Sequence, residues 1–266
     1  MCRLAAYVGP AVPLSTLLYD APRSLQVQAY DPREQLSGAV NVDGTGIAWW
    51  PAGDAEPLRY VTERPPWSDV NLPTLAARLR SGAQLAAVRG ATPGLGHGAG
   101  LTAPFVHEHV AGAHNGFIAE YRTRVARRLL QRLPDHLHAR VEAASDSHAL
   151  FLLAMAHLEA DPHAALAGAA AAAVTEAAAV CADLGTPATL TLLLADGTTV
   201  VGTRTASGTA ANTLYTLEDG ARWPGATLLA SEPLDDDLGW RPVPDGSVVQ
   251  VSATEVRTTR VTRSPA

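Results

Sequence analysis

The order in which strand-like and helix-like segments follow one another constrains this chain more than any other feature. Short apolar runs typical of strands occur both before and after a central block of helix-like runs. Because apolar sheet faces must be covered by another layer, this order predicts an α+β fold in which two sheets pack together and helices cover the outside. The predicted strands are 3–8, 46–50, 84–89, 106–113, 189–195, 198–204, 213–217, 226–230, 247–252 and 255–261. The predicted helices are 72–81, 119–133, 146–159 and 162–184.

Turn and capping residues mark several of these boundaries. Asp196-Gly197 lies between two strand-like runs and supplies the positive φ angles of a tight hairpin turn. Ser145 is a typical N-cap, which places Asp146 in the first turn of its helix. The last helix is expected to begin at Asp161-Pro162, as cap and first position, and to end before Gly185.

Cys2 follows the initiator methionine directly. Removal of Met1 would leave one residue that holds both a thiol and a free α-amine. A terminal amine titrates at about 8, so it is suited to act as the base that activates the thiol. The pairing indicates an N-terminal nucleophile enzyme, while the alternative is a cysteine without any role.

Three downstream segments supply the groups that a γ-glutamyl amide requires. They are Arg89-Gly90-Ala91-Thr92, His114-Asn115-Gly116 and Ser145-Asp146-Ser147. Arginine binds a carboxylate through two parallel hydrogen bonds, and an ionised aspartate complements an ammonium group. An asparagine amide and a glycine backbone N–H both donate to a developing oxyanion.

Each segment also has a purely structural interpretation. Arg89 ends the apolar run 85–88 and is equally typical of a surface arginine at a strand end. Asn115-Gly116 is a common hairpin dipeptide, so a turn is expected at this point in either case. Asp146 complements the macrodipole of its helix, as acidic residues in a first turn usually do. Only the ordered combination is specific.

Together with Met1-Cys2-Arg3, these segments resemble the class II glutamine amidotransferase domain, in which a terminal cysteine attacks the side-chain amide of glutamine. The resemblance spans most of the chain and implies the four-layer αββα sandwich of N-terminal nucleophile hydrolases. It implies that Cys2 is the nucleophile and that Asn115 and Gly116 form the oxyanion hole. The substrate-binding residues that it implies are Arg89 for the α-carboxylate, Asp146 for the α-ammonium, and Thr92 and His114.

Two further regions narrow the resemblance. Segments 22–30, 32–34 and 41–46, and segment 231–237 with Gly239-Trp240, look like the γ-glutamyl hydrolases of ergothioneine biosynthesis. That family implies a stand-alone amidohydrolase that converts γ-glutamyl-hercynylcysteine sulfoxide into glutamate and hercynylcysteine sulfoxide, with no metal or organic cofactor. The aromatic candidates for a cation–π contact with a trimethylammonium group are Tyr30, Trp49, Trp50, Trp67 and Trp240.

Three positions depart from these patterns. Thr45 and Gly90 stand where bulky aromatic residues are expected, and His148 stands where an acidic or small residue is expected. Three functional alternatives therefore stay open: a glutaminase that supplies ammonia to a separate synthase, an N-terminal cysteine amidase for another substrate class, and a non-enzymatic binding module.

Composition excludes several mechanisms. All 20 basic residues are arginine, and a pyridoxal-phosphate Schiff base or a Walker-type phosphate loop needs a lysine. The net charge of −6 argues against nucleic-acid binding, and five arginines between 122 and 132 are expected to form a solvated helix face. Cys181 is expected to be a buried, inert thiol.

Length and hydropathy indicate one domain over residues 1–266, since no Pro/Gly/Ser-rich linker divides the chain. No apolar stretch is expected to approach the ~20 residues of a membrane span, and a signal peptide is not recognised. A cytoplasmic enzyme with a small-molecule γ-glutamyl substrate is therefore expected, without a membrane partner and with homo-oligomer formation left open.

Other clusters favour structural interpretations. His107 and His109 would share a face of a strand over 106–113, but a metal site lacks a fourth ligand, so half-exposed histidines are favoured. The glycine-rich stretch 94–100 is expected to be a mobile loop near Arg89. The triplet Asp235-Asp236-Asp237 is expected either in a solvated turn or in a role that shapes the pocket.

Overall fold

The computed structural model describes residues 2–91, 96, 98–141, 145–161, 163 and 165–261. The strands are β1 (Arg3–Pro13), β2 (Thr45–Trp49), β3 (Leu58–Thr62), β4 (Arg80–Val88), β5 (Phe105–His107), β6 (Val110–Ile118), β7 (Ala188–Ala195), β8 (Val200–Arg204), β9 (Ala206–Ser207), β10 (Tyr215–Glu218), β11 (Thr227–Ala230), β12 (Arg241–Pro242), β13 (Ser247–Val251) and β14 (Val256–Arg260). The helical segments are η1 (Thr16–Asp20), α1 (Leu25–Tyr30), η2 (Pro66–Ser68), α2 (Leu72–Arg78), η3 (Ala99–Leu101), η4 (Tyr121–Val125), α3 (Ala126–Leu130), α4 (Asp135–His138), α5 (Asp146–Ala160) and α6 (Leu166–Leu184).

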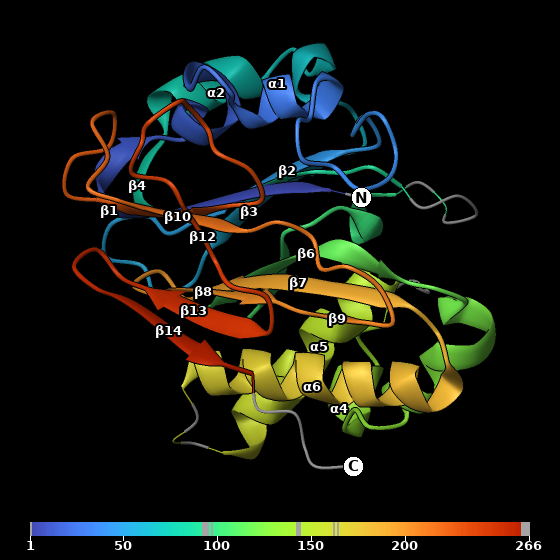
Figure 1. Ribbon diagram of the computed structural model, residues 1–266. Helices are drawn as coiled ribbons and strands as arrows, with labels where there is room; N and C mark the ends of the chain where they lie inside the picture. Colours follow the sequence, from blue (N-terminus) through green and yellow to red (C-terminus); the bar gives the residue numbers. More distant parts are fainter. Residues whose placement is uncertain are drawn as a thin grey trace.

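Two sheets stack face to face between two helical layers (Figure 1). The first sheet has the order β12-β10-β11-β1-β4-β2-β3, and α1 and α2 cover its outer face. The second has the order β14-β13-β8-β7-β6-β5, with β9 paired to β7, and α5 and α6 cover its outer face. The predicted α+β fold, a four-layer αββα sandwich, is confirmed.

The central strands are buried on both faces, which explains why they appear in the sequence as nearly continuous apolar runs. In β1, Leu4 and Ala6 pack between the two sheets, whereas Ala5 and Tyr7 pack toward α1. All eight residues of β7 are buried. Because successive side chains on a strand point to opposite faces, a strand covered on both sides needs apolar residues at every position.

Helix α6 contradicts the expectation that no apolar stretch approaches the length of a membrane span. Among the described residues, it is the one helix that is long enough and apolar enough to cross a membrane, judged by length and composition alone. In the structure it lies along the second sheet, with Ala170, Val174, Ala177 and Cys181 buried on the side that faces β7 and β8. This spacing is that of one helix face packed against a core. Burial raises the pKa of the Cys181 thiol to about 11, as expected for an inert buried cysteine.

A hairpin turn divides the predicted strand 106–113. Glu108 has a positive φ of 49° and lies between β5 and β6, which pair antiparallel. His107 and His109 therefore do not share a strand face, and that prediction is wrong. The turn predicted at Asn115-Gly116 is also wrong, because β6 runs through both residues and pairs along its length with β7.

The predicted helix 119–133 is the other main correction. The structure has two shorter elements here, the π-helical turn η4 and the short helix α3. Glu120, which precedes η4, has a positive φ of 51°. The five arginines of this region are exposed, as predicted. Predicted helix 72–81 ends earlier, since Ser81 belongs to β4. Segments η1, α1 and β3 were not predicted.

Several turn and cap predictions are confirmed. The Asp196 carboxylate accepts hydrogen bonds from the backbone N–H groups of Thr198 and Thr199, and Gly197 has a φ of 93°. Ser145 caps α5 by accepting a hydrogen bond from the backbone N–H of His148 at 3.3 Å. Gly185 ends α6 with a φ of 64°. The predicted start of this helix at Asp161-Pro162 is wrong, because Asp161 is the C-cap of α5 and α6 begins at Leu166, after its N-cap Ala165.

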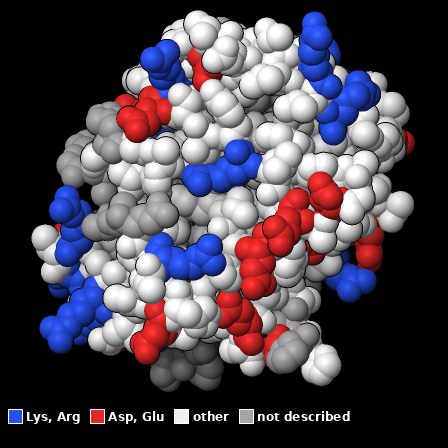
Figure 2. All heavy atoms as spheres, turned by 180° about the vertical axis from the view of Figure 1, so that it is seen from behind, with Lys and Arg blue, Asp and Glu red and all other residues white. Residues whose placement is uncertain are grey.

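Figure 2 shows the face of the molecule opposite to that in Figure 1. Acidic side chains form a band across this face, and arginines stand in separate groups around it. The visible described surface is therefore of mixed charge rather than uniformly basic.

A matched pair of glycine substitutions tests how α5 packs on β6. A Cβ added at Gly112 would collide with the ring of Phe151, whereas one added at Gly168 meets no described atom within 4 Å. We expect Gly112→Ala to lower the free energy of unfolding by about 1–3 kcal/mol through overpacking. Gly168→Ala, in an exposed helical position, should raise it by about 0.5–1 kcal/mol. Denaturant unfolding of both variants checks this, and equal stabilities would contradict the packing described.

Candidate active site

A pocket forms where the N-terminal end of β1 meets the ends of β4 and β6 and the start of α5. The residues that line it are Cys2, Ala87, Arg89, Gly90, Ala91, Leu101, Ala103, Phe105, His114, Gly116, Ser145, Asp146 and Ser147. The antiparallel register pairs Arg3 with Val88, so Cys2 and Arg89 lie next to each other at one end of the first sheet. The structure thus gathers five of the seven predicted site residues in one pocket.

Cys2 is half-buried and packs against the core between the sheets. Its backbone carbonyl accepts a hydrogen bond from Nε of Arg3 at 2.8 Å. The thiol is free, as is that of Cys181. A half-buried free thiol at the rim of a pocket is accessible to a small substrate while its backbone is held in place.

Asn115 lies beneath this pocket and does not line it, because its side chain is fully buried. The amide is satisfied when Nδ2 donates to the Cys2 carbonyl at 2.8 Å and Oδ1 accepts from Nη2 of Arg3 at 3.3 Å. Its own carbonyl accepts a hydrogen bond from Nδ2 of Asn212 at 2.9 Å. The side chain that was predicted to form the oxyanion hole is thus held directly beside Cys2.

Gly116 lines the pocket, and a side chain has no room there. A Cβ would collide with the backbone carbonyl of Thr189 and with the ring of His114. Glycine is required because the strands β6 and β7 and the His114 ring meet at this point, which leaves the Gly116 backbone accessible from the pocket.

Arg89 is 7% exposed, so the interpretation as a surface arginine is wrong. Its Nη2 donates to the carbonyl of Gly96 at 3.0 Å and its Nη1 to that of Asp43 at 3.4 Å. The Asp43 carboxylate accepts from the backbone N–H of Ala91 at 2.7 Å, and the backbone N–H of Arg89 donates to Gly44. The segment around Asp43 therefore supports the guanidinium, which donates to two backbone carbonyls.

Asp146 is the first residue of α5 and is 6% exposed. Its carboxylate accepts hydrogen bonds from the backbone N–H of Ile118 at 2.8 Å and of Ser147 at 2.7 Å. The helix N-terminus favours a negative charge at this position. These contacts orient the carboxylate and link the start of α5 to β6.

His114 is buried between β7 and the start of α5. Its Nε2 lies 2.9 Å from the carbonyl of Thr189, which only accepts, so Nε2 carries a proton, and its Nδ1 lies 3.0 Å from the hydroxyl oxygen of Ser147. Burial lowers the pKa of His114 below 6.5, while the nearby Asp146 carboxylate opposes that change. A neutral ring adds no positive charge to the pocket floor.

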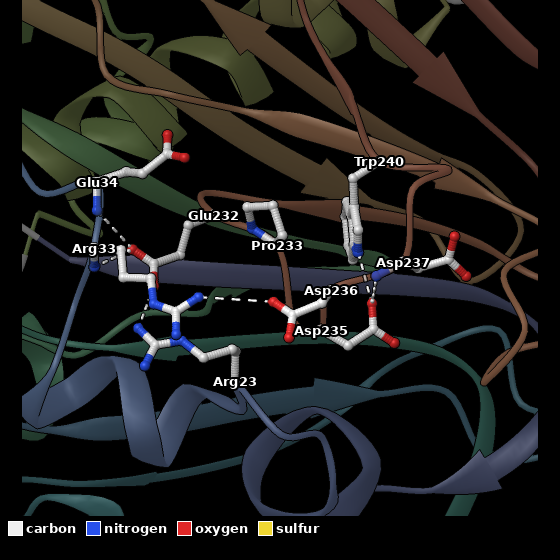
Figure 3. Close-up of a pocket in the computed structure, with 9 residues that line it drawn as sticks. All are labelled: Arg23, Arg33, Glu34, Glu232, Pro233, Asp235, Asp236, Asp237 and Trp240. Atoms are coloured by element: carbon white, nitrogen blue, oxygen red, sulfur yellow. Dashed lines mark hydrogen bonds and ion pairs between the residues drawn. The ribbon is translucent and has the colours of Figure 1, made fainter.

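A second network joins the two regions 22–34 and 231–240 (Figure 3). Glu232 is 1% exposed and lies 3.6 Å from Nη1 of Arg3 and 3.4 Å from Nη2 of Arg23. Oε2, the oxygen that faces Arg3, also accepts hydrogen bonds from the backbone N–H groups of Arg33 at 3.0 Å and Glu34 at 3.1 Å. Removing one member of such a buried ion pair costs about 3–5 kcal/mol, because the other charge is left uncompensated.

Comparison with known families identifies the family to which the chain belongs. The family model for class II glutamine amidotransferases matches residues 17–217 of the chain. The chain belongs to the class II glutamine amidotransferases. The predicted resemblance is therefore confirmed.

Two curated relatives are similar over nearly their full lengths. The chain is 34% identical over 264 residues to the gamma-glutamyl-hercynylcysteine sulfoxide hydrolase of Mycobacterium tuberculosis, covering 99% of this chain and 98% of that protein. It is 32% identical over 256 residues to the protein of the same name from Mycolicibacterium smegmatis, covering 96% of this chain and 98% of that protein. Both similarities bear out the narrower resemblance to γ-glutamyl hydrolases that the sequence indicated.

Among solved structures, the chain resembles a glutamine aminotransferase class-II domain protein from Silicibacter pomeroyi. The TM-score is 0.70 at 23% sequence identity, and the match covers 98% of this chain and 100% of the other. At this sequence identity the likeness shows only that the two proteins share a fold.

Of the three positions that depart from the family pattern, Gly90 lines the pocket, while Thr45 and His148 are buried. Thr45 is buried and donates through Oγ1 to the carbonyl of Arg64. His148 stacks on Phe105, with ring centroids 4.8 Å apart, and Phe105 lines the pocket. The His148 ring therefore contacts the pocket of this amidotransferase through Phe105, a side chain that lines it. Thr92, a predicted substrate-binding residue, lies outside the described residues.

Two residues of the buried network were not assigned any role from the sequence. Arg3 contacts both Cys2 and Asn115, and Glu232 provides its counter-charge. The signals available were the position of Arg3 next to the nucleophile and the presence of Glu232 in segment 231–237. Neither signal indicates that the two side chains meet.

The remaining polar clusters have structural partners. His107 lies 2.8 Å from a Glu159 carboxylate oxygen through Nε2 and 2.8 Å from Arg140 through Nδ1. In the described part of the chain, no group of three or more histidine, cysteine, aspartate or glutamate side chains is arranged to hold a metal ion. Of the five aromatic candidates, Trp49, Trp50 and Trp240 are buried, while Tyr30 and Trp67 stack edge to face on the surface.

The neutral state of His114 predicts a specific pH dependence of stability. Just below pH 6.5 the unfolded chain binds a proton at this position that the folded chain does not, so stability should fall as the pH drops through this window and be complete above it. Each unit of pKa difference corresponds to about 1.4 kcal/mol.

Replacement of His114 should therefore flatten the pH profile. We expect His114→Gln to reduce the slope of unfolding free energy against pH between pH 5 and 6.5, with His138→Gln, at an exposed position, as the matched control. Urea titrations at several pH values measure both slopes. An unchanged slope in His114→Gln would show that the ring is not held neutral.

Proposed function

We propose that this protein hydrolyses the γ-glutamyl amide bond of γ-glutamyl-hercynylcysteine sulfoxide through a thioester on Cys2. The observation that carries the proposal is the convergence of Cys2, Arg89, Gly116 and Asp146 on one pocket. Similarity over 98% of the two mycobacterial hydrolases supports the choice of substrate.

Arg89 and Asp146 are assigned to the amino-acid end of the substrate. The guanidinium forks toward a carboxylate in two parallel hydrogen bonds, in exchange for its present bonds to backbone carbonyls. The Asp146 carboxylate, oriented by two backbone N–H groups, accepts the α-ammonium. Holding both charges directs the δ-carbonyl toward Cys2 and supplies the proximity that a bimolecular reaction lacks.

The first half of the reaction forms the thioester. After Met1 is removed, the α-amine of Cys2 accepts the thiol proton, and Sγ attacks the δ-carbon of the substrate. Nδ2 of Asn115 and the backbone N–H of Gly116 donate to the oxyanion, a contribution of about 3–4 kcal/mol per donor. The carbon–nitrogen bond then breaks, and the ammonium proton passes to the leaving nitrogen.

The second half regenerates the enzyme. Water attacks the thioester carbon and gives a proton to the α-amine, the same donors hold the second oxyanion, and the carbon–sulfur bond breaks. The sulfur recovers the proton from the amine, and glutamate leaves. The cycle needs only side chains and backbone groups of this chain.

The leaving half of the substrate is assigned to the hollow in Figure 3. This hollow of about 270 Å³ is lined by Arg23, Arg33, Glu34, Glu232, Pro233, Asp235, Asp236, Asp237 and Trp240. Glu232 links it to Arg3, the residue after the nucleophile. Carboxylates and an aromatic face suit a trimethylammonium group, and arginines suit its carboxylate.

A direct comparison of substrates tests the proposal. The Met1-free protein is mixed with γ-glutamyl-hercynylcysteine sulfoxide or with glutamine, and glutamate release is followed for each. We expect release from the sulfoxide to be much faster. Fast release from glutamine and little from the sulfoxide would instead identify a glutaminase that feeds a separate synthase, and no release from either would contradict the enzymatic assignment.

Removal of the nucleophile tests the covalent chemistry. We expect Cys2→Ala to abolish glutamate release while the unfolding midpoint stays near that of the parent protein, because Cys2 is half-buried and its backbone bonds are retained. Cys181→Ala, which removes the other free thiol, is the control and should remain active. Substantial turnover by Cys2→Ala would exclude the thioester.

A charge reversal tests the leaving-group hollow. Asp236 is 92% exposed, so its replacement should not disturb the fold. Asp236→Arg should raise the KM for the sulfoxide about 3- to 10-fold, as expected for changing one exposed charge interaction of about 1 kcal/mol, and leave the KM for glutamine unchanged. Asp183→Arg, at an exposed position on α6, is the matched control. Equal changes for both substrates would place the leaving group elsewhere.

A further inference from the structure

The guanidinium of Arg3 has three nitrogens, and each faces a different partner. Nε donates to the carbonyl of Cys2 at 2.8 Å, Nη2 donates to Oδ1 of Asn115 at 3.3 Å, and Nη1 lies 3.6 Å from Glu232. The side chain is 0% exposed. One planar group thus links the nucleophile's residue, the second sheet and the segment that follows β11.

The contact with Asn115 determines which end of the amide faces the nucleophile. An amide presents either two N–H donors or an acceptor oxygen, and the two orientations differ by a half-turn of the side chain. Because Arg3 only donates and the Cys2 carbonyl only accepts, both contacts favour the orientation in which Oδ1 faces Arg3 and Nδ2 faces Cys2. One N–H of Nδ2 donates to the Cys2 carbonyl, and the second is the donor assigned to the oxyanion.

We infer that Arg3 is a positioning residue that holds the Asn115 amide in the donor orientation which the reaction requires. This inference rests on the proposed function, since it assigns how that same oxyanion site is kept in order. In the opposite orientation Oδ1 would face the oxyanion and repel it. A donor that is fixed before substrate binds stabilises the transition state without reorganisation.

Glu232 is the second part of the device. It compensates the charge of Arg3 and also accepts from the backbone N–H groups of Arg33 and Glu34, in the loop that borders the leaving-group hollow. The position of the guanidinium therefore depends on that loop. Lysine, with a single ammonium on a flexible stem, cannot face three partners in one plane.

The chain offers a sharp test in a double-mutant cycle of Arg3→Lys with Asn115→Ala. Arg3→Lys keeps a positive charge for Glu232 but loses the fork. We expect a fall in kcat of about 100-fold, the size typical of a lost oxyanion donor, with KM changed less than two-fold. Asn115→Ala should show a similar loss, and the double variant should be no slower than Asn115→Ala. Intact mass first confirms that Met1 is removed from every variant.

Losses that multiply in the double variant would overturn the inference, because Arg3 would then act independently of Asn115. Glu232→Gln supplies a second arm should Arg3→Lys fold poorly: its expected kcat loss of about 10-fold should also disappear in the Asn115→Ala background. A loss that persists there would have the same contrary meaning.

A measurement that does not need turnover separates this inference from the proposed function. The side-chain NH2 of Asn115 can be followed by 15N NMR, with Asn115→Ala used to assign the signal. In the parent protein and in Cys2→Ala we expect two distinct, slowly exchanging protons, and in Arg3→Lys fast exchange. Equal protection in both would show that Arg3 does not hold the amide, whichever substrate the enzyme uses.

Discussion

A charged side chain buried directly after Cys2 organises this end of the molecule. The Arg3 guanidinium is fully buried, and burial lowers its pKa while Glu232 opposes that change. Because an uncompensated buried charge is so unfavourable, β1 must lie where Glu232 follows β11. That placement sets Cys2 beside Arg89 and above Asn115. Arg3 contacts the Cys2 carbonyl and the Asn115 amide, and Glu232 lines the hollow shown in Figure 3.

The architecture could be predicted from the sequence because both sheets are packed on two sides. Strands such as β7 stand out as continuous apolar runs, and Gly185 and Asp196-Gly197 mark ends with a clear physical signal. The turn at Glu108 could not be predicted, since a glutamate with positive φ is rare and no glycine, proline or asparagine accompanies it. The edge strand β3 is only five residues long and half-exposed, so its pattern is weak.

The candidate site could be predicted in part for a different reason. Cys2, Arg89 and Asp146 belong to short segments whose residue types match the chemistry, and the structure brings them to one pocket. The contacts of Arg3 and Glu232 depend on which strands become neighbours, and side chains so far apart in sequence carry no local signal of their pairing. The interpretation of Asn115-Gly116 as a turn failed because pairing with β7 outweighs the turn preference of that dipeptide.

We propose that Cys2, freed of Met1, carries the glutamyl group during turnover. Rapid acid quench of the enzyme with γ-glutamyl-hercynylcysteine sulfoxide, followed by peptide mass spectrometry, tests it most directly. We expect a glutamyl adduct on the Cys2 thiol of a peptide that lacks Met1, formed within the first turnover and lost as substrate is consumed. Full turnover with Cys2 unmodified, or with Met1 still attached, would contradict it.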